Sequence, residues 1–99
     1  EEVVAKVSDL YASRCDIQRD KDWYALKLTE EVGELNAEYL RLSGRGRKKG
    51  LSDSEIRENL GRECADVLAH LMLFARDNGI DLEHELKAKW FKQLEKAND

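Results

Sequence analysis

The stretch Leu28–Leu42, "LTEEVGELNAEYLRL", repeats apolar residues at alternating spacings of four and three. The repeating residues are Leu28, Val32, Leu35, Tyr39 and Leu42. A helix of about 3.6 residues per turn places such residues on one side, so the stretch predicts an amphipathic helix. The same pattern returns further along the chain, where the matching residues are Leu60, Cys64, Val67, Leu71 and Phe74. Two helices with matching apolar sides predict an antiparallel helical hairpin with both apolar rows, Cys64 included, in its core.

Two more helices are expected, one before and one after the hairpin. Val3, Val7, Leu10 and Tyr11 have helical spacing near the start of the chain. The last helix carries Leu82, Leu86, Trp90 and Leu94, with Trp90 expected in the core. The chain has 99 residues, no proline and no strand pattern of useful length. We therefore predict a single all-α domain, residues 1–99, with a flanking helix on each side of the hairpin.

Several residues are typical of helix ends. Asp20 or Asp22 can cap the second helix, and Ser52 with Glu55 has the spacing of a capping box at the start of the third. Gly79 is expected to close the third helix in a left-handed conformation, and Asp81 to cap the fourth. The glycine-rich, basic segment 43–50 must be the loop of the hairpin.

The composition excludes several classes of protein. A net charge of −4 argues against a general nucleic-acid binder, which is normally basic. The apolar runs are too short for a transmembrane helix or a signal peptide. Two cysteines, Cys15 and Cys64, make neither a disulfide framework nor a zinc site, which fits a reducing, cytoplasmic setting. A chain of this length also favours assembly into a dimer or tetramer, because a single small core buries little apolar surface.

Acidic residues repeat in the same register as the apolar rows. Glu31 precedes Leu35 as Glu63 precedes Val67, and Glu34 corresponds in the same way to Asp66. On a helical wheel, the first acid of each pair lies about 40° from the apolar row and the second about 100°. Both pairs therefore border the face that packs in the hairpin. Glu30 lies about 140° away and is expected to point further outward.

Four carboxylates that converge in one partly desolvated groove repel one another unless a cation joins them. Their oxygens are ligands that Mg²⁺, Mn²⁺ or Ca²⁺ prefer. The sequence thus indicates a divalent-metal site at Glu31, Glu34, Glu63 and Asp66. The alternative, equally open from the pattern alone, is a helical hairpin whose acidic flanks are merely solvated.

The segments "KLTEEVGEL" and "ECADVLAHL" resemble the MazG-type members of the all-α nucleoside triphosphate pyrophosphohydrolases. The signature of that superfamily is Glu-Glu-x-x-Glu on one helix and Glu-x-x-Asp on the next. Here it reads Glu30, Glu31 and Glu34, then Glu63 and Asp66. The resemblance covers roughly residues 23–90 and implies a four-helix MazG-like fold that assembles as a helical-bundle dimer or tetramer.

The resemblance also implies a reaction, in which a (deoxy)nucleoside triphosphate and water give the monophosphate and pyrophosphate, as in house-cleaning of the nucleotide pool. It implies Mg²⁺, with Mn²⁺ as a substitute, held by Glu31, Glu34, Glu63 and Asp66. Glu30 would support the catalytic carboxylates, and which carboxylate acts as the base stays open. The expected partners are the nucleotide and further copies of the chain, without nucleic acid or membrane.

Two alternatives remain. The segment "ECADVLAHL", including its histidine, also resembles phosphoribosyl-ATP pyrophosphohydrolase of histidine biosynthesis. That enzyme is a rival within the same superfamily. A non-catalytic helical module for nucleotide binding or assembly is the competing class. The retention of every ligand-type acid argues against the non-catalytic module.

Other residues are candidates for substrate binding. Lys27 can bind a phosphate or simply pair with Glu31 one turn away. His70 can contact a base or ribose, or serve as a hydrogen-bonded interface histidine. Trp23 can stack on a base or anchor the start of its helix. The remaining candidates are basic residues that can reach a triphosphate or stay solvated, namely Arg45, Arg47 and Lys89.

Overall fold

The computed structural model describes residues 2–15 and 17–98, together with every side chain in those ranges except that of residue 98. Within these residues the regular structure is entirely helical. Helix α1 spans Glu2–Cys15, α2 spans Lys21–Leu42 and α3 spans Asp53–Asp77. The predicted all-α fold class is confirmed.

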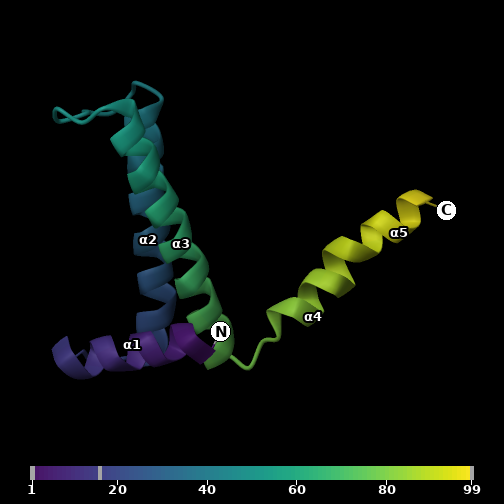
Figure 1. Cartoon of the computed structure of the whole chain (residues 1–99). Helices are drawn as coiled ribbons and strands as arrows, with labels where there is room; N and C mark the ends of the chain where they lie inside the picture. Colours follow the sequence, from purple (N-terminus) through teal and green to yellow (C-terminus); the bar gives the residue numbers. More distant parts are fainter. Residues whose placement is uncertain (1, 16, 99) are drawn as a thin grey trace.

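Helices α2 and α3 lie side by side as an antiparallel hairpin, and α1 crosses the end of the hairpin opposite the loop (Figure 1). The expected central hairpin is therefore present. The loop between α2 and α3 turns through Gly44 and Gly50, both with positive φ. Lys48 Nζ lies 2.8 Å from Asp53 Oδ1, so the loop is tied to the start of α3.

The helix ends follow the capping residues read from the sequence. Asp20 accepts a hydrogen bond from the backbone N–H of Trp23 at 2.8 Å and so caps α2. Ser52 and Glu55 form the expected capping box at the start of α3. Each such bond satisfies a backbone N–H that has no partner inside its helix.

The hairpin contact is rotated from the predicted one. On α2 the residues turned toward α3 include Glu31 and Glu38, which are buried between the half-buried Leu28, Leu35 and Leu42. Of the rest of the predicted apolar rows, Leu60, Val67 and Phe74 are half-buried, whereas the exposed members are Val32, Tyr39, Leu71 and Cys64. The expectation of a fully buried row with Cys64 in the core was therefore wrong for the single chain. Two helices cover only one line of side chains on each other, and the second line needs another layer.

A C-terminal arm leaves the hairpin after α3 and projects away from it (Figure 1). The arm consists of α4 (Leu82–Leu86), a π-helical turn η1 (Lys87–Phe91) and α5 (Lys92–Asn98). Asp81 caps it as predicted, by accepting from the N–H of His84 at 3.1 Å. The expectation that this last helix flanks the hairpin with Trp90 in the core was wrong, because Trp90 is 66% exposed.

The turn before the arm explains its direction. The N–H groups of Gly79 and Ile80 donate to the carbonyl groups of Arg76 and Ala75, which is the Schellman pattern of helix termination. Gly79 has φ +67, as the sequence predicted, and residues with a Cβ rarely adopt that value. The turn is therefore set by local hydrogen bonds and leads directly into the Asp81 cap.

None of the described helices combines the length and the apolar character needed to cross a membrane.

The capping box gives a first prediction. Replacing Ser52 by alanine removes the acceptor for the Glu55 N–H, so Ser52→Ala should lower the free energy of unfolding by about 0.5–2 kcal/mol. Urea unfolding followed by circular dichroism measures the change. Ser54→Ala is the matched control, since Ser54 is exposed and lies within the same first turn. Equal stability of the two variants would contradict the assigned cap.

Candidate functional site

Five carboxylates from α2 and α3 form two overlapping triads halfway along the hairpin. One triad is Glu30, Glu31 and Glu34, and the other is Glu31, Glu63 and Asp66. Within each triad, one carboxylate oxygen per residue lies within 4.8 Å of the others. Glu31 belongs to both, so the two triads form a single acidic cluster. The structure thus brings together the acids that the repeated register paired.

Glu30 lies closer to the cluster than the helical wheel indicated. Its carboxylate joins the first triad although its Cα was expected to point outward. Lys27 accounts for part of this position, because its Nζ lies 3.4 Å from Glu30 Oε1 and 3.6 Å from Glu31 Oε1. Glu30 is exposed, as the wheel predicted, but its long side chain still brings a carboxylate oxygen to the first triad.

Glu31 is buried in the hairpin contact, with 6% of its surface exposed. Burial raises the pKa of Glu31, and the adjacent charge of Glu34 raises it further. Burial likewise raises the pKa of Glu63, again with a contribution from Glu34. The charge of Lys27 lowers the pKa of Glu31 only in part, so the cluster resists full ionisation.

Two oxygens of the cluster are buried without a hydrogen-bond donor among the described residues. They are Oε2 of Glu31 and Oε2 of Glu63. A buried carboxylate oxygen without a partner costs free energy, because it has lost its water and gained nothing in exchange. Each of these oxygens therefore keeps an unused acceptor position inside the cluster.

The donor set fits a hard divalent cation. All five cluster residues offer carboxylate oxygens, the ligands that Mg²⁺, Mn²⁺ and Ca²⁺ take. Glu34 and Asp66 are exposed, so one side of the cluster stays open to solvent and to a substrate. The four ligands that the resemblance implied, Glu31, Glu34, Glu63 and Asp66, all belong to this cluster, and their binding of a metal stays a prediction.

Lys27 and His70 border the cluster. For Lys27, burial lowers the pKa, but the hydrogen bonds and charges of Glu30 and Glu31 together outweigh it, so the net pKa is raised and the ammonium stays charged. His70 Nε2 lies 3.8 Å from Glu31 Oε1. Burial lowers the pKa of His70, and nearby Lys27 lowers it further, so the imidazole is neutral at pH 7.

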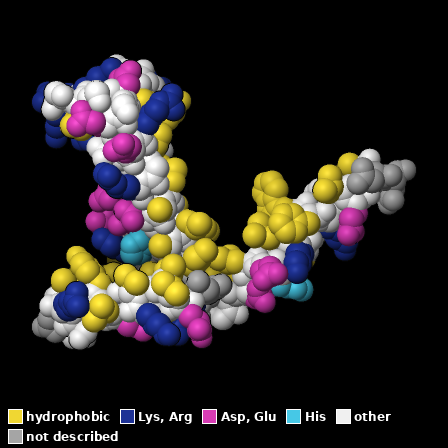
Figure 2. Space-filling model, in the orientation of Figure 1, with side chains coloured by type: hydrophobic (Ala, Val, Ile, Leu, Met, Phe, Trp, Pro, Cys, Tyr) yellow, Lys and Arg dark blue, Asp and Glu magenta, His cyan; other side chains and the backbone are white. Residues whose placement is uncertain are grey.

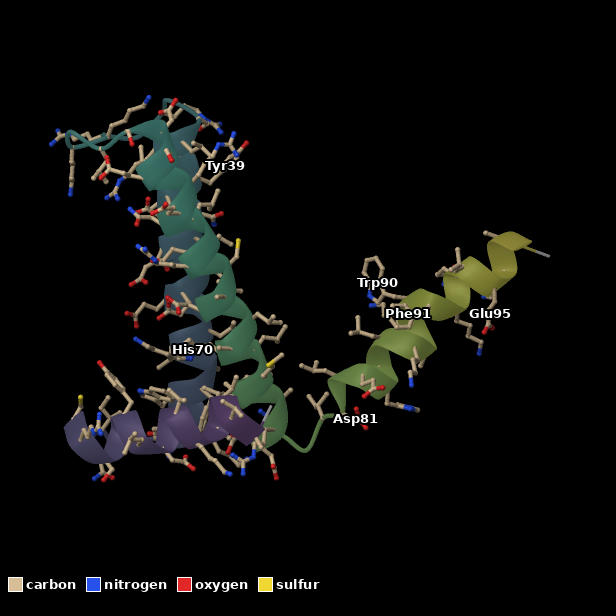
Figure 3. All side chains as sticks on the ribbon, in the orientation of Figure 1. Tyr39, His70, Asp81, Trp90, Phe91 and Glu95 are labelled. Carbon is tan, nitrogen blue, oxygen red and sulfur yellow. The ribbon has the colours of Figure 1, made fainter. Side chains whose placement is uncertain are left out.

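A cavity of about 650 Å³ opens beside the cluster, between α1 and the hairpin. Its polar end is formed by Lys27, Glu31 and Asp66, and its other walls include Trp23 and His70. The rings of Trp23 and His70 meet edge to face, with centroids 6.2 Å apart. Figure 3 shows His70 extending from the side of the hairpin above α1. The cavity has the size of a small-molecule site and joins acids to an aromatic wall.

Three predicted substrate contacts lie elsewhere in the structure. Arg45 and Arg47 belong to the loop at the far end of the hairpin (Figure 1). There the Arg45 guanidinium lies over the ring of Tyr39, 5.5 Å from its centroid. Lys89 lies in the arm. The structure does not bring these residues to the acidic cluster.

Two features of the site were not identified in the sequence. Glu38 is buried, accepts a hydrogen bond from Arg41 and keeps its Oε2 unpaired within the described chain. A signal for Glu38 existed, because it follows Glu31 by two helical turns. The second feature is the wall that α1 adds to the cavity, with residues Val3, Val4, Val7 and Tyr11. No local pattern could predict that wall, since it depends on how α1 crosses the hairpin.

In comparisons with known proteins, the sequence matches no family model, and neither a curated protein nor a solved structure matches the chain. The chemistry of the site therefore rests on its own geometry.

The raised pKa values predict how the metal-free protein responds to pH. A carboxyl group whose pKa is higher in the folded state contributes stability below its unfolded pKa, about 4.5, and this stability is lost as the pH rises through the folded pKa. Glutamine does not ionise, so Glu31→Gln removes this loss of stability at position 31. We expect the metal-free variant to be more stable than the wild type at pH 7. In a domain of this length, each gain of about 1 kcal/mol in the free energy of unfolding raises Tm by roughly 4–8 °C.

Thermal unfolding between pH 4.5 and pH 7, with and without MgCl₂, checks this expectation. Magnesium should raise the Tm of the wild type and leave that of Glu31→Gln nearly unchanged. Glu58→Gln is the control, because Glu58 is exposed on α3 and belongs to neither triad. A destabilised metal-free Glu31→Gln would show that Glu31 is satisfied within the hairpin and needs no cation.

Proposed function

We propose that this chain is a magnesium-dependent nucleotide pyrophosphohydrolase, which converts a (deoxy)nucleoside triphosphate and water into the monophosphate and pyrophosphate. The observation that carries the proposal is the acidic cluster around buried Glu31, with unpaired oxygens beside a cavity that has an aromatic wall. A nucleotide offers the complementary groups, namely anionic phosphates that share a divalent cation and a planar base that packs against rings. Two free cysteines suit a reducing, cytoplasmic setting.

The metal ligands in this proposal are Glu31, Glu34, Glu63 and Asp66. A magnesium ion bound there would neutralise the charge of the phosphate oxygens and make the α-phosphorus more susceptible to attack. Manganese is the expected substitute, because it prefers the same oxygen ligands.

The residues of the chain then have distinct tasks. Lys27 stays protonated and can donate to a phosphate oxygen at the edge of the cluster. A carboxylate of the cluster accepts a proton from the attacking water, while the oxygen of that water bonds to the α-phosphorus. The bond from that phosphorus to the bridging oxygen breaks, and pyrophosphate leaves with the electron pair. Glu30, more exposed and bonded to Lys27, orients either the water or that lysine.

The base belongs in the cavity between α1 and the hairpin. Trp23 offers a ring face or edge for packing, and neutral His70 can donate or accept a hydrogen bond. Arg45, Arg47 and Lys89 are not part of the proposed contacts, because the loop and the arm lie away from the cluster.

The activity is tested by pyrophosphate release from a panel of ribo- and deoxyribonucleoside triphosphates and phosphoribosyl-ATP, with and without Mg²⁺. We expect Mg²⁺-dependent release from at least one triphosphate. Asp66→Asn should lower the rate by about 100-fold or more while the circular dichroism spectrum stays unchanged. Glu58→Gln, on the same helix and outside the cluster, should retain the wild-type rate.

Turnover of phosphoribosyl-ATP alone would assign the chain to the histidine pathway instead. A folded wild-type protein that releases pyrophosphate from no compound of the panel would contradict the enzyme proposal.

Trp23 provides a separate prediction on substrate binding. Stacking of a base on an aromatic side chain contributes about 1–3 kcal/mol, so Trp23→Ala should raise KM by roughly 5- to 150-fold, with a smaller change in kcat. Trp23→Phe keeps a ring in place and should stay close to the wild type. If both variants keep the wild-type KM, the base binds elsewhere.

We also propose that the functional unit contains at least two copies of the chain. The fully or nearly buried apolar side chains of the described residues are few and mostly small; they are Ala5, Ala12, Ile56, Leu73 and Ala75. Such a core stabilises a domain of this length weakly, and association is the usual remedy.

A further inference from the structure

The single chain exposes more surface than a folded monomer of its mass. Its accessible surface is 7759 Å² for 11.4 kDa, whereas folded monomeric proteins of this mass expose about 5,800 Å². Its radius of gyration is 16.9 Å, compared with about 12.6 Å expected for a compact domain of this length. The excess of roughly 2,000 Å² per chain matches what each partner buries in an obligate dimer.

Part of the excess lies on the C-terminal arm. Leu86, Trp90, Phe91 and Leu94 are all about half exposed or more. The π-helical turn η1 lies between Leu86 and Leu94 and contains both aromatic residues. Figure 2 shows a hydrophobic patch on the side of the arm that faces the hairpin, and Figure 3 shows Trp90 on that side and Glu95 on the other.

A second apolar surface lies on the hairpin. Val32 and Tyr39 on α2, with Leu68 and Leu71 on α3, are exposed. Cys64 precedes Leu68 by four residues and Leu71 by seven, so it shares their side of α3. In Figure 2 hydrophobic side chains line the side of the hairpin that faces the arm, while acidic ones gather on the opposite side. The surface is thus separate from the acidic cluster.

These two apolar surfaces border the open angle between the hairpin and the arm (Figures 1 and 2). The Schellman bonds end at the N–H of Ile80, and the arm begins with the cap made by the side chain of Asp81. In the single chain the arm projects away from the hairpin, so both apolar surfaces are left uncovered.

We propose that a second copy of this chain occupies the angle, so that the arm of each copy contacts the hairpin of the other. The arm of each copy then packs its Trp90 side on the exposed hairpin surface of the other. The occupant is a second copy because the excess exposed surface of one chain matches what each partner buries in an obligate dimer. In a two-fold dimer the arm of each copy meets the hairpin of the other, so both apolar surfaces are covered at once.

This inference deepens the proposed assembly and is independent of the proposed reaction. The arm docks on the apolar side of the hairpin, so disruption of the dimer and loss of the metal site are separable results.

The test uses the full chain with Trp23→Phe, which leaves Trp90 as the single tryptophan. Sedimentation velocity measures mass across a dilution series, while the emission maximum and acrylamide quenching of Trp90 report its contact with water. We expect a dimer whose Trp90 emission is blue-shifted and protected, and both properties should be lost over the same concentration range as the dimer. Trp90→Ala should weaken dimerisation by roughly tenfold or more. Glu95→Ala, on the opposite side of the arm, should leave it unchanged.

Three results would overturn the proposal. One is a monomer at every concentration. Another is a dimer in which Trp90 remains fully accessible to quencher. The third is a protected Trp90 in the monomer, because the arm would then cover its own hairpin.

Crosslinking separates an arm-to-hairpin contact from an arm-to-arm contact. One chain carries Leu94→Cys with both native cysteines replaced by serine, and the other carries Cys15→Ser and keeps Cys64. After mixing and treatment with a short bismaleimide, we expect links between Cys64 of one chain and position 94 of the other. Links between two arms without any arm-to-hairpin link would contradict the exchange.

Discussion

The contact between α2 and α3 is the interaction on which the rest of this structure depends. Its α2 side alternates leucines with glutamates, in the order Leu28, Glu31, Leu35, Glu38 and Leu42. The leucines stabilise the hairpin by leaving water, at about 25 cal/mol for each Å² of apolar surface. The glutamates oppose it, because a buried carboxylate loses hydration and repels its acidic neighbours. The same line of side chains therefore holds the two helices together and places the acidic cluster between them.

Because the two helices bury only this line of side chains, two other sides of the hairpin keep groups without partners among the described residues. On one side, Glu31 and Glu63 keep buried oxygens that lack a donor in the described part of the chain. On the other, Val32, Tyr39 and Leu71 face solvent. In the two proposals, a divalent cation addresses the first deficit and the apolar surface of a second copy addresses the second. Because the two lie on opposite sides of the helices, the catalytic and assembly proposals concern separate surfaces of one small scaffold.

Much of the local structure was predictable because it depends on neighbours in sequence. Asp20, Ser52, Gly79 and Asp81 end or begin helices where their side chains or backbone freedom allow it. The place of the acids at the border of the contact also followed from register, and they converge because both pairs lie near the middle of an antiparallel hairpin. Glu30 is exposed as predicted, but its contact with Lys27 depends on side-chain reach, which backbone angles do not describe.

The sequence by itself determined the all-α class, the helix ends and the pairing of Glu31 and Glu34 with Glu63 and Asp66. These features depend on hydrogen bonds within a few residues and on the period of the helix. Only the tertiary structure decided which line of each helix is buried, where α1 closes the cavity and that Trp90 is carried away on an arm. Those features depend on the crossing of helices and on the direction of a turn, and many directions satisfy the same amphipathic pattern.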